Sequence, residues 1–468
     1  MGRRNKPFFE KVEITGVGAE GNAIAKINDM VVFVKMVAPG DVVDLQVIKK
    51  RKRYMEARVT AFHKYSDLRV KPFCKHFGVC GGCKWQHLPY PEQLKFKHQQ
   101  VIDAMVRIGG LEIPEPHPIM GSENERYYRN KLEFSFSNQK WKTREEIEST
   151  EIIEDAPALG FHVPGLFDKI VDIEECWLQE DPSNRIRNTI KDFGVKNGLE
   201  FFNPRDQSGL LRNLVIRTGS DSEIMVIMVF RREDEKSRIR LLDHLLEEIP
   251  GITSLFYVIN EKLNDTLYDQ EMVLYHGKDH IIERMEELQF RIGPKSFFQT
   301  NSKQSLELYR KAREFAGLTG KEVVYDLYTG TGTIANFVAK KSAHVIGIES
   351  VPEAIEDAKV NSALNKITNT RFYSGDIKDV FNDAFIAENG RPDVVITDPP
   401  RAGMHQSVVE KLLELRPGKI VYVSCNPATQ ARDLKILDEA YRIMQIQPVD
   451  MFPHTHHVEN IVFLELRN

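Results

Sequence analysis

The last third of the chain alternates short apolar runs with helical segments, and this alternation constrains the fold more than any other feature. Strand-like runs occupy 323–328, 345–349, 370–373, 394–397 and 420–424, with helical segments at 334–341 and 352–365. Apolar strands separated by helices are typical of a parallel sheet covered on both faces. We therefore predict a doubly wound α/β sheet, with a ligand site at the carboxyl ends of its strands.

The first strands of this sheet end in residues suited to a nucleoside ligand. The turn Asp326-Leu-Tyr-Thr-Gly-Thr-Gly-Thr333 is glycine-rich but lacks the full Gly-x-Gly-x-x-Gly pattern of dinucleotide sites. Glu349 closes the second strand, where a carboxylate can accept hydrogen bonds from both ribose hydroxyls. Asp376 follows the next strand and either reaches the adenine edge or lies in solvent. Together these features favour S-adenosylmethionine over a dinucleotide.

Cys425 lies at the end of the run Ile420-Val-Tyr-Val-Ser-Cys-Asn-Pro427, a strand that stops at a polar turn. A cysteine in this position is on its own more often a small buried apolar residue. Upstream, however, Asp398-Pro-Pro-Arg401 ends the preceding strand in a rigid, polar rim. A thiol held beside a carboxylate at a sheet edge favours a nucleophile that attacks its substrate covalently.

The N-terminal region is basic although the whole chain has a net charge of −4. Residues 1–90 contain 17 Lys and Arg against 8 Asp and Glu, which gives this part +9, with the densest run at Lys49-Lys-Arg-Lys-Arg53. Residues 9–63 alternate short β-branched runs with turn residues, which predicts a small β-barrel of OB type. Such a barrel would bind the phosphate backbone of RNA; the alternative is a barrel that mediates protein contacts.

Three cysteines, Cys74, Cys80 and Cys83, fall within ten residues that also contain three glycines. Cys176 is the one remaining cysteine besides Cys425, and it can complete a set of four. Four thiolates hold either a tetrahedral zinc ion or an iron–sulfur cluster. A compact trio with one distant partner suits a [4Fe–4S] cluster better than zinc, although spacing alone does not decide between them. The first role of such a group would be structural.

The region between the cysteines and the α/β sheet predicts a mixed α+β domain. It has a helix at 90–106 and strands at 127–137, 213–218 and 224–230. Arg126 and Arg129 flank Tyr127 and Tyr128, a mixture that suits either RNA contacts or a core with charged partners. We therefore divide the chain into a barrel (1–66), a central domain with the cysteines (67–280) and a C-terminal domain (281–468).

Composition excludes several classes of protein. With 41% apolar and 28% charged residues the chain is typical of a globular protein, and no apolar run approaches the roughly 18 residues of a membrane span. The N-terminus lacks the apolar stretch of a signal peptide. We expect a cytoplasmic monomer without membrane contact, in which the thiols stay reduced.

The motifs together resemble the RNA (uracil-5-)-methyltransferases, and in particular the branch that modifies 23S ribosomal RNA and has an N-terminal TRAM barrel and a [4Fe–4S] cluster. The resemblance covers almost the whole chain. It rests on the barrel, the four cysteines and, in order, Ser296–Asn301, the glycine-rich turn, Asp398–Arg401, Ser424–Pro427 and His457–Glu459. It implies methylation of C5 of a uridine in 23S ribosomal RNA, with S-adenosylmethionine as methyl donor.

Carried over residue by residue, the resemblance makes Cys425 the nucleophile and Glu459 the base, and assigns Cys74, Cys80, Cys83 and Cys176 to the cluster. Cofactor positions fall on Gln299, Tyr328, Thr333, Glu349, Asp376 and Asp398. The turn reads Tyr-Thr-Gly-Thr-Gly-Thr where the family often has Phe-Cys-Gly, and Asp376 stands where an amide is common. Alternatives are a transfer-RNA (uracil-5-)-methyltransferase, a 5-methylcytosine enzyme and a non-catalytic RNA-binding protein of the same fold.

Overall fold

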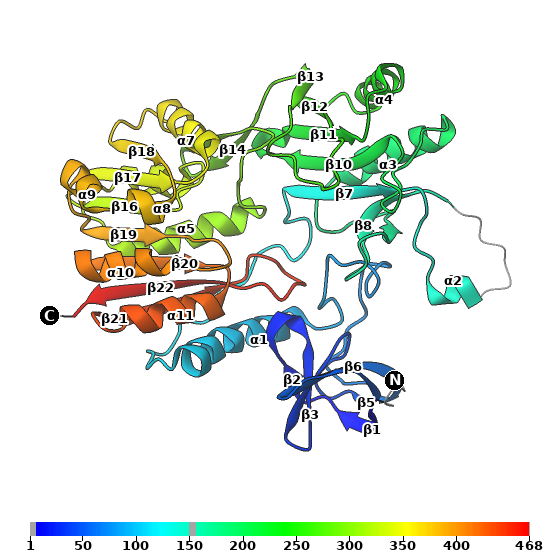
Figure 1. The fold of residues 1–468 in the computed structure, drawn as a ribbon, viewed down its shortest axis with the longest axis horizontal. Coiled ribbons are helices and arrows are strands. Elements are labelled where there is room, and N and C mark those ends of the chain that lie inside the picture. The colour runs from blue at the N-terminus through cyan, green and yellow to red at the C-terminus, as the bar shows by residue number, and fades with distance from the viewer. Residues whose placement is uncertain (1–5, 149–155, 468) are drawn as a thin grey trace.

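The computed structural model describes residues 6–148 and 156–467, which form three successive bodies around three sheets (Figure 1). An N-terminal barrel is followed by a central sheet with helices and by a C-terminal sheet with helices on both faces. This order confirms the predicted fold class of β-barrel, mixed α+β region and doubly wound sheet. Among the described residues no helix has the length and apolar character needed to cross a bilayer.

The barrel has six strands in the order β1-β5-β6-β4-β3-β2. They are β1 (Phe8–Glu13), β2 (Gly16–Val17), β3 (Ala23–Ile27), β4 (Met30–Val34), β5 (Val42–Lys50) and β6 (Tyr54–Lys64), with a short 3₁₀ turn η1 (Ala19–Gly21). Although β1 and β2 stand at opposite ends of this order, only Ile14 and Thr15 separate them in the chain, so the sheet curls back on itself. Alanine, valine and leucine side chains fill its interior, among them Ala25, Val32 and Leu45 at 0% exposure.

The central sheet has the order β13-β12-β11-β10-β7-β8-β9. Its strands are β7 (Lys131–Ser137), β8 (Ala158–His162), β9 (Ile170–Asp172), β10 (Leu211–Thr218), β11 (Ile224–Phe230), β12 (Ser254–Ile259) and β13 (Val273–Gly277). Its helices are α2 (Arg144–Glu148), α3 (Ser183–Lys196) and α4 (Glu235–Glu248), with a 3₁₀ turn η3 (Ser220–Ser222). Leucine and isoleucine side chains of α3 and α4 pack against the sheet in one apolar core.

One predicted strand begins later than expected. The sequence predicted a strand from Tyr127, whereas β7 begins at Lys131. Tyr127 has φ 55°, a left-handed conformation that interrupts an extended strand. The two adjacent tyrosines of this segment also differ in burial. Tyr128 is a core residue with 6% exposure, whereas Tyr127 is 39% exposed.

The C-terminal sheet has the order β18-β17-β16-β19-β20-β22-β21, in which β22 runs antiparallel to both of its neighbours and the other strands are parallel to one another. Its strands are β16 (Val323–Leu327), β17 (His344–Glu349), β18 (Thr370–Ser374), β19 (Val394–Thr397), β20 (Lys419–Ser424), β21 (Tyr441–Val449) and β22 (Glu459–Leu466). The hairpin β14 (Ile281–Met285) and β15 (Leu288–Ile292) precedes them.

Helices cover both faces of this sheet. They are needed because successive side chains of each strand point to opposite faces and both sets are apolar. Val324 packs with α5 (Ser302–Ala316) and α6 (Thr333–Ala339), whereas its neighbour Tyr325 packs with α9 (Asp383–Asn389) and α10 (Gln406–Leu415). The remaining helices are α7 (Pro352–Leu364), α8 (Ile377–Val380) and α11 (Pro427–Leu437).

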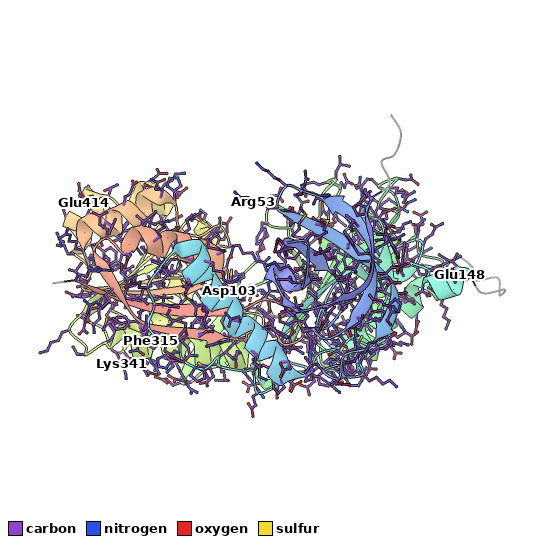
Figure 2. All side chains as sticks on the ribbon, turned by 90° about the horizontal axis from the view of Figure 1, so that it is seen from below. Arg53, Asp103, Glu148, Phe315, Lys341 and Glu414 are labelled. Atoms are coloured by element: carbon purple, nitrogen blue, oxygen red, sulfur yellow. The ribbon has the colours of Figure 1, made fainter. Side chains whose placement is uncertain are left out.

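Helix α1 (Tyr90–Asp103), extended by a π-helical turn η2 (Ala104–Gly109), runs from the barrel onto the C-terminal sheet (Figure 2). It packs against α11 and β21. A fully buried ion pair holds this contact: the Lys97 ammonium lies 2.5 Å from the Asp450 carboxylate, and both side chains are at 0% exposure. Lys97 also donates to the carbonyl of Phe452, so this pair fixes the segment that follows β21.

We expect Lys97→Met to lower the free energy of unfolding by about 3–5 kcal/mol, because it leaves the Asp450 carboxylate buried without a cation. The double variant Lys97→Met/Asp450→Asn removes both charges and should regain more than half of that loss. Urea denaturation midpoints measure both effects. A single variant that loses less than about 1 kcal/mol would show that water solvates this carboxylate.

Candidate active site

Four strand ends of the C-terminal sheet meet at one edge and carry most of the candidate residues. Tyr328 follows β16, Glu349 ends β17, Asp398 follows β19 and Cys425 follows β20. Because these strands are parallel, their carboxyl ends lie side by side. The parallel arrangement of these strands is thus enough to bring two carboxylates, a thiol and an aromatic ring to one edge of the sheet.

The antiparallel strand β22 brings Glu459 to the same place. Ser424 of β20 pairs with Asn460 of β22, so continuing the register by one residue sets Cys425 opposite Glu459. Glu459 is also the first residue of its strand and is 5% exposed. Glu459 lies beside Cys425 only because of the register in which β20 and β22 pair, and local sequence does not specify that register.

Hydrogen bonds lock the two strand-end loops to each other. Asn426 caps α11 by accepting from the Ala428 amide, and its side-chain amide donates 3.0 Å to the carbonyl of Arg401. Thr429 donates to the same carbonyl. The Asn-Pro that follows Cys425 therefore fixes the Asp-Pro-Pro-Arg loop, and the thiol and Asp398 move as one unit.

The site is a desolvated cluster of acids around a thiol. Burial raises the pKa of Asp398 to about 7 and the pKa of Glu459 to about 8, where the neighbouring Asp398 adds to the effect. Burial, together with the neighbouring Glu459 and Asp398 carboxylates, raises the pKa of Cys425 to about 11. The Arg401 guanidinium opposes these shifts at Cys425 and Glu459. At neutral pH these groups therefore hold protons that exposed side chains of the same types would partly or fully lose.

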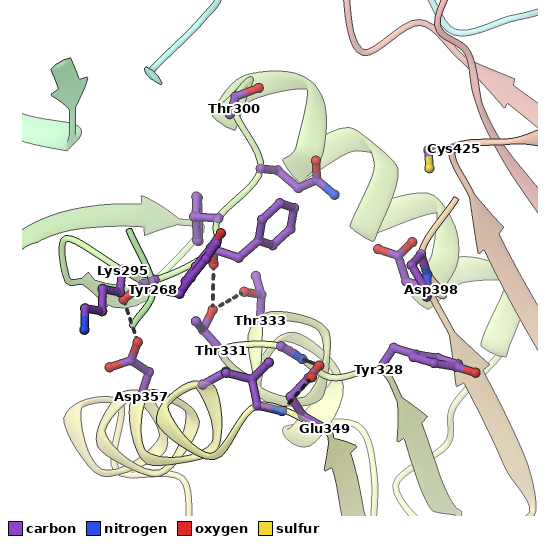
Figure 3. A pocket seen from close by; sticks show the side chains of 18 of the residues that line it. Tyr268, Lys295, Thr300, Tyr328, Thr331, Thr333, Glu349, Asp357, Asp398 and Cys425 are labelled. Carbon is purple, nitrogen blue, oxygen red and sulfur yellow. Dashed lines mark hydrogen bonds between the residues drawn. The ribbon is translucent and has the colours of Figure 1, made fainter. Parts of the chain in front are cut away.

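The glycine-rich turn is built around two carboxylates. Asp326 is fully buried and accepts from the Thr329 hydroxyl and the Ala335 amide, which holds the turn and the start of α6 together. Glu349 accepts from the amides of Gly330 and Val351 through different oxygens. Figure 3 shows the Glu349 carboxylate beneath the turn, beside Thr331 and Thr333.

A single cavity of about 1410 Å³ joins these groups. Five of the six predicted cofactor residues line it, namely Gln299, Tyr328, Thr333, Glu349 and Asp398, together with Cys425 and Glu459. A site for one small molecule usually measures about 300–1,000 Å³, so this cavity has room for a nucleoside cofactor and a second ligand. In Figure 3 the Cys425 thiol and Asp398 lie on one side of the cavity, and Glu349 and Thr333 lie further along it.

Asp376 is the predicted cofactor residue that the structure places elsewhere. It is exposed and is not among the residues that line the cavity. Its carboxylate caps α8 by accepting from the Lys378 amide and pairs with the Lys378 ammonium at 2.9 Å. Of the two positions that the sequence left open, the structure has Asp376 on the solvent side.

Several lining residues were not expected from the sequence. His456 and His457 line the cavity in the loop before Glu459, and burial lowers their pKa values to about 3 and 4, so both imidazoles are neutral. Lys84 and Arg129 reach the same cavity from the cysteine loop and the central domain. The sequence could have suggested the histidines because they adjoin Glu459, but it held no signal for Lys84.

The four predicted cluster cysteines lie around a second, small cavity. Cys74, Cys80, Cys83 and Cys176 all line a space of about 30 Å³, although they come from segments about ninety residues apart. The Gly82 amide donates to the sulfur of Cys80, and Asn184 fixes both backbone groups of Cys176. Within 6–148 and 156–467, no group of three or more His, Cys, Asp or Glu side chains is arranged around the position of a metal ion.

Comparison with known families matches both ends of the chain. Residues 269–467 match the tRNA (Uracil-5-)-methyltransferase family, and residues 10–60 match the TRAM domain. These matches cover the C-terminal sheet with most of the cavity-lining residues, and the N-terminal barrel, respectively.

Relatives match over nearly their full length. An RNA methyltransferase of Bacteroides thetaiotaomicron, named as uncharacterized, is 58% identical over 96% of this chain and 100% of its own. One of Chlorobaculum tepidum, named likewise, is 40% identical over 92% of this chain and 90% of its own. Among solved structures, the Pyrococcus abyssi tRNA (uracil-54, C5)-methyltransferase with S-adenosyl-L-homocysteine has a TM-score of 0.76 and is 31% identical, covering 97% of this chain and 100% of its own.

The two family matches and the full-length relatives agree with the geometry of the strand edge. The N-terminal barrel is a TRAM domain, and the C-terminal sheet has the fold of an S-adenosylmethionine-dependent methyltransferase. The chain is an RNA-modifying enzyme that belongs to the RNA (uracil-5-)-methyltransferase family.

Proposed function

We propose that this enzyme methylates C5 of a uridine in 23S ribosomal RNA through a covalent bond between Cys425 and C6 of the base. The observation that supports it most directly is the convergence of Cys425, Asp398 and Glu459 on one desolvated cavity that also holds the glycine-rich turn. Family membership alone implies the reaction, whereas this convergence suggests which groups perform it.

We assign S-adenosylmethionine to the part of the cavity beside the turn. Glu349 would accept hydrogen bonds from the ribose hydroxyls, and Gln299, Tyr328 and Thr333 would contact the remainder of the cofactor. Asp398 stands between this part and the thiol and would orient the methyl donor or the uracil edge. Asp376 would join the site only after release from Lys378, so we propose a lesser role for it.

Cys425 would supply the activation that uracil needs. C5 of uracil is a poor nucleophile, but addition of the thiolate to C6 converts the ring into an enolate with electron density on C5. The methyl group then passes from the sulfonium to C5. The Cys425 pKa of about 11 keeps the thiol protonated in the free enzyme, so thiolate formation would be coupled to substrate binding. Since C6 is inaccessible in a stacked helix, the uridine would be flipped into the cavity.

Glu459 would complete the reaction as general base. After methyl transfer the adduct still carries a proton at C5, which must leave before the C6–sulfur bond can break. Glu459 lies opposite Cys425 across the β20–β22 register, and this proximity supports the role. The proton goes to its carboxylate, the electron pair forms the C5–C6 double bond, and the thiolate departs.

We further propose that the four cysteines hold a [4Fe–4S] cluster. The four cysteines line one small cavity although Cys176 is about ninety residues from the other three, and this convergence supports the proposal. An amide donor on Cys80 also suits a cluster thiolate. Such a group would tie residues 74–83 to Cys176 and so support the wall that contributes Gly81, Gly82 and Lys84 to the catalytic cavity.

Transfer RNA is the second candidate substrate, because the Pyrococcus abyssi enzyme that resembles this chain over its whole length is named for transfer RNA. Mapping 5-methyluridine in ribosomal and transfer RNA from a deletion strain distinguishes the two. We expect the loss of one or more sites in 23S ribosomal RNA. If 5-methyluridine were lost from transfer RNA alone, transfer RNA would be the substrate.

The wider organisation follows the same proposal. We propose domain boundaries near residues 66 and 280, supported by the end of β6 at Lys64 and the start of β14 at Ile281. We also propose that the enzyme works as a monomer in the cytoplasm, where RNA is available and thiols remain reduced.

Cys425→Ala should abolish methyl transfer to RNA while S-adenosylmethionine binding stays within twofold of the parent, because the cofactor residues are unchanged. Glu459→Gln should instead accumulate a covalent protein–RNA species, since addition and methyl transfer proceed but the C5 proton stays. Tritium transfer and denaturing gels measure the two effects. Wild-type turnover by Cys425→Ala would exclude the covalent mechanism.

The reaction rate should rise with pH between about 6 and 9. Glu459 acts as base only when ionised, and its pKa of about 8 makes the active form scarce at lower pH. The raised pKa of Cys425 acts in the same direction. Single-turnover rates at saturating RNA test this, and a rate that is flat or falls over this range would contradict the roles of both groups.

Anaerobically purified protein should contain about four iron and four sulfide per chain. Cys80→Ser and Cys176→Ser should lose both elements, whereas Cys425→Ala, the matched change at the fifth cysteine, should keep them. Metal and sulfide analysis gives the result. Zinc in place of iron, or full iron content in the Cys176 variant, would refute the assignment.

A further inference from the structure

The TRAM barrel carries a stacked aromatic pair that faces outward. The rings of Phe62 and Tyr65 lie parallel within 18°, with centroids 4.6 Å apart. Both are exposed, Phe62 at 37% and Tyr65 at 62%, although packing and burial of such rings are favourable. Tyr65 follows directly after the end of β6 at Lys64.

A fixed cation completes this pair. The guanidinium carbon of Arg69 lies 5.3 Å from the Phe62 centroid and 5.5 Å from the Tyr65 centroid. Because these distances are nearly equal and the centroids are only 4.6 Å apart, Arg69 sits beside the stack and does not cover the outer face of either ring. Those faces are therefore not used by the cation.

Arg69 is held in place by a buried carboxylate. Asp41, at 0% exposure, accepts from Nε of Arg69 at 2.8 Å and from Nη2 at 2.7 Å, and it also binds the amides of Ala38 and Ser66. Nη2 donates further to the Met36 carbonyl. The other terminal nitrogen, Nη1, has no hydrogen-bond partner among the residues that the structure describes, so it can still donate to an anion. The bidentate geometry orders the cation before any ligand arrives.

The surroundings of the pair are basic, and the barrel that carries it contacts the wall of the catalytic cavity. Exposed Arg58, Lys64 and Lys71 flank the pair along the chain. The barrel itself is tied to the cavity wall, since Lys84, which lines the cavity, donates 2.9 Å to the carbonyl of Glu20 in the barrel. RNA whose target base enters the cavity would thus continue over a positively charged barrel surface.

We propose that Phe62, Tyr65 and Arg69 form a stacking site for an unpaired nucleobase of the RNA, outside the nucleotide that is methylated. An open aromatic face accepts any base, and a cation beside the stack suits the phosphate that follows that base. The site would require a single-stranded segment near the target uridine. This inference rests on the proposed RNA substrate but not on the covalent mechanism.

The test measures binding without chemistry. A fluorescein-labelled 20-nucleotide single-stranded RNA and the fully paired duplex of the same sequence are titrated with full-length protein, with no methyl donor present. Tyr65→Ala should weaken binding of the single strand about tenfold and leave the duplex unchanged, while Tyr65→Phe, which keeps the ring, should stay within twofold. Phe8→Ala is the matched control, because Phe8 is 48% exposed on the same barrel.

Salt dependence separates stacking from charge. Tyr65→Ala should lower affinity equally at all salt concentrations, so the slope of log Kd against log salt should not change, whereas Lys64→Ala should reduce the slope. Thermal melting of each variant confirms the fold. Equal losses in Tyr65→Ala and Phe8→Ala, or single-strand binding by Tyr65→Ala at the parent's affinity, would overturn the stacking site. Because no methyl transfer is measured, failure of the Cys425 mechanism would not affect this outcome.

Discussion

One electrostatic constraint governs the site: a thiol and two carboxylates meet where burial removes most of the water around them. Asp398 and Glu459 have pKa values raised to about 7 and 8, and Cys425 to about 11, so the free enzyme cannot ionise all three. Such crowding destabilises the folded state as pH rises through these values, since the folded protein then retains protons that the unfolded chain has released. A site that lowers the stability of the fold in this way is explained most simply by catalysis in which protons move to and from Asp398, Glu459 and Cys425.

The surrounding structure serves to hold this constellation in register. The parallel strands bring Asp398 and Cys425 to one edge, the β20–β22 pairing adds Glu459, and hydrogen bonds from Asn426 and Thr429 fix the two loops to each other. The buried Lys97–Asp450 pair anchors helix α1 beside the loop that carries His456 and His457. The cysteine loop, the central domain and the C-terminal domain therefore all contribute to one cavity wall, and the barrel contacts that wall through Lys84.

Local sequence predicted the elements well where one face of each is buried. The strands that end at Asp398 and Cys425 were identified because continuous apolar runs stop at a proline-containing turn. Strand β3 (Ala23–Ile27) was missed, since short alanine-rich runs between glycine and asparagine resemble turn sequences. The strand predicted from Tyr127 began too early, because tertiary contacts impose a left-handed backbone that the residue type does not suggest. Lys84 shows the same limit, since its position depends on a contact with the distant Glu20, whereas Asp376 is held by its neighbour Lys378.

The most direct test of the covalent mechanism uses RNA in which 5-fluorouridine replaces uridine. Fluorine at C5 cannot leave as a proton does, so the Cys425–C6 bond should persist after methyl transfer. In the presence of S-adenosylmethionine we expect a protein–RNA band that survives denaturing electrophoresis, with the cross-link on the peptide containing Cys425 and absent from Cys425→Ala. An enzyme that methylates ordinary RNA but never forms this band would contradict the central role of the thiol.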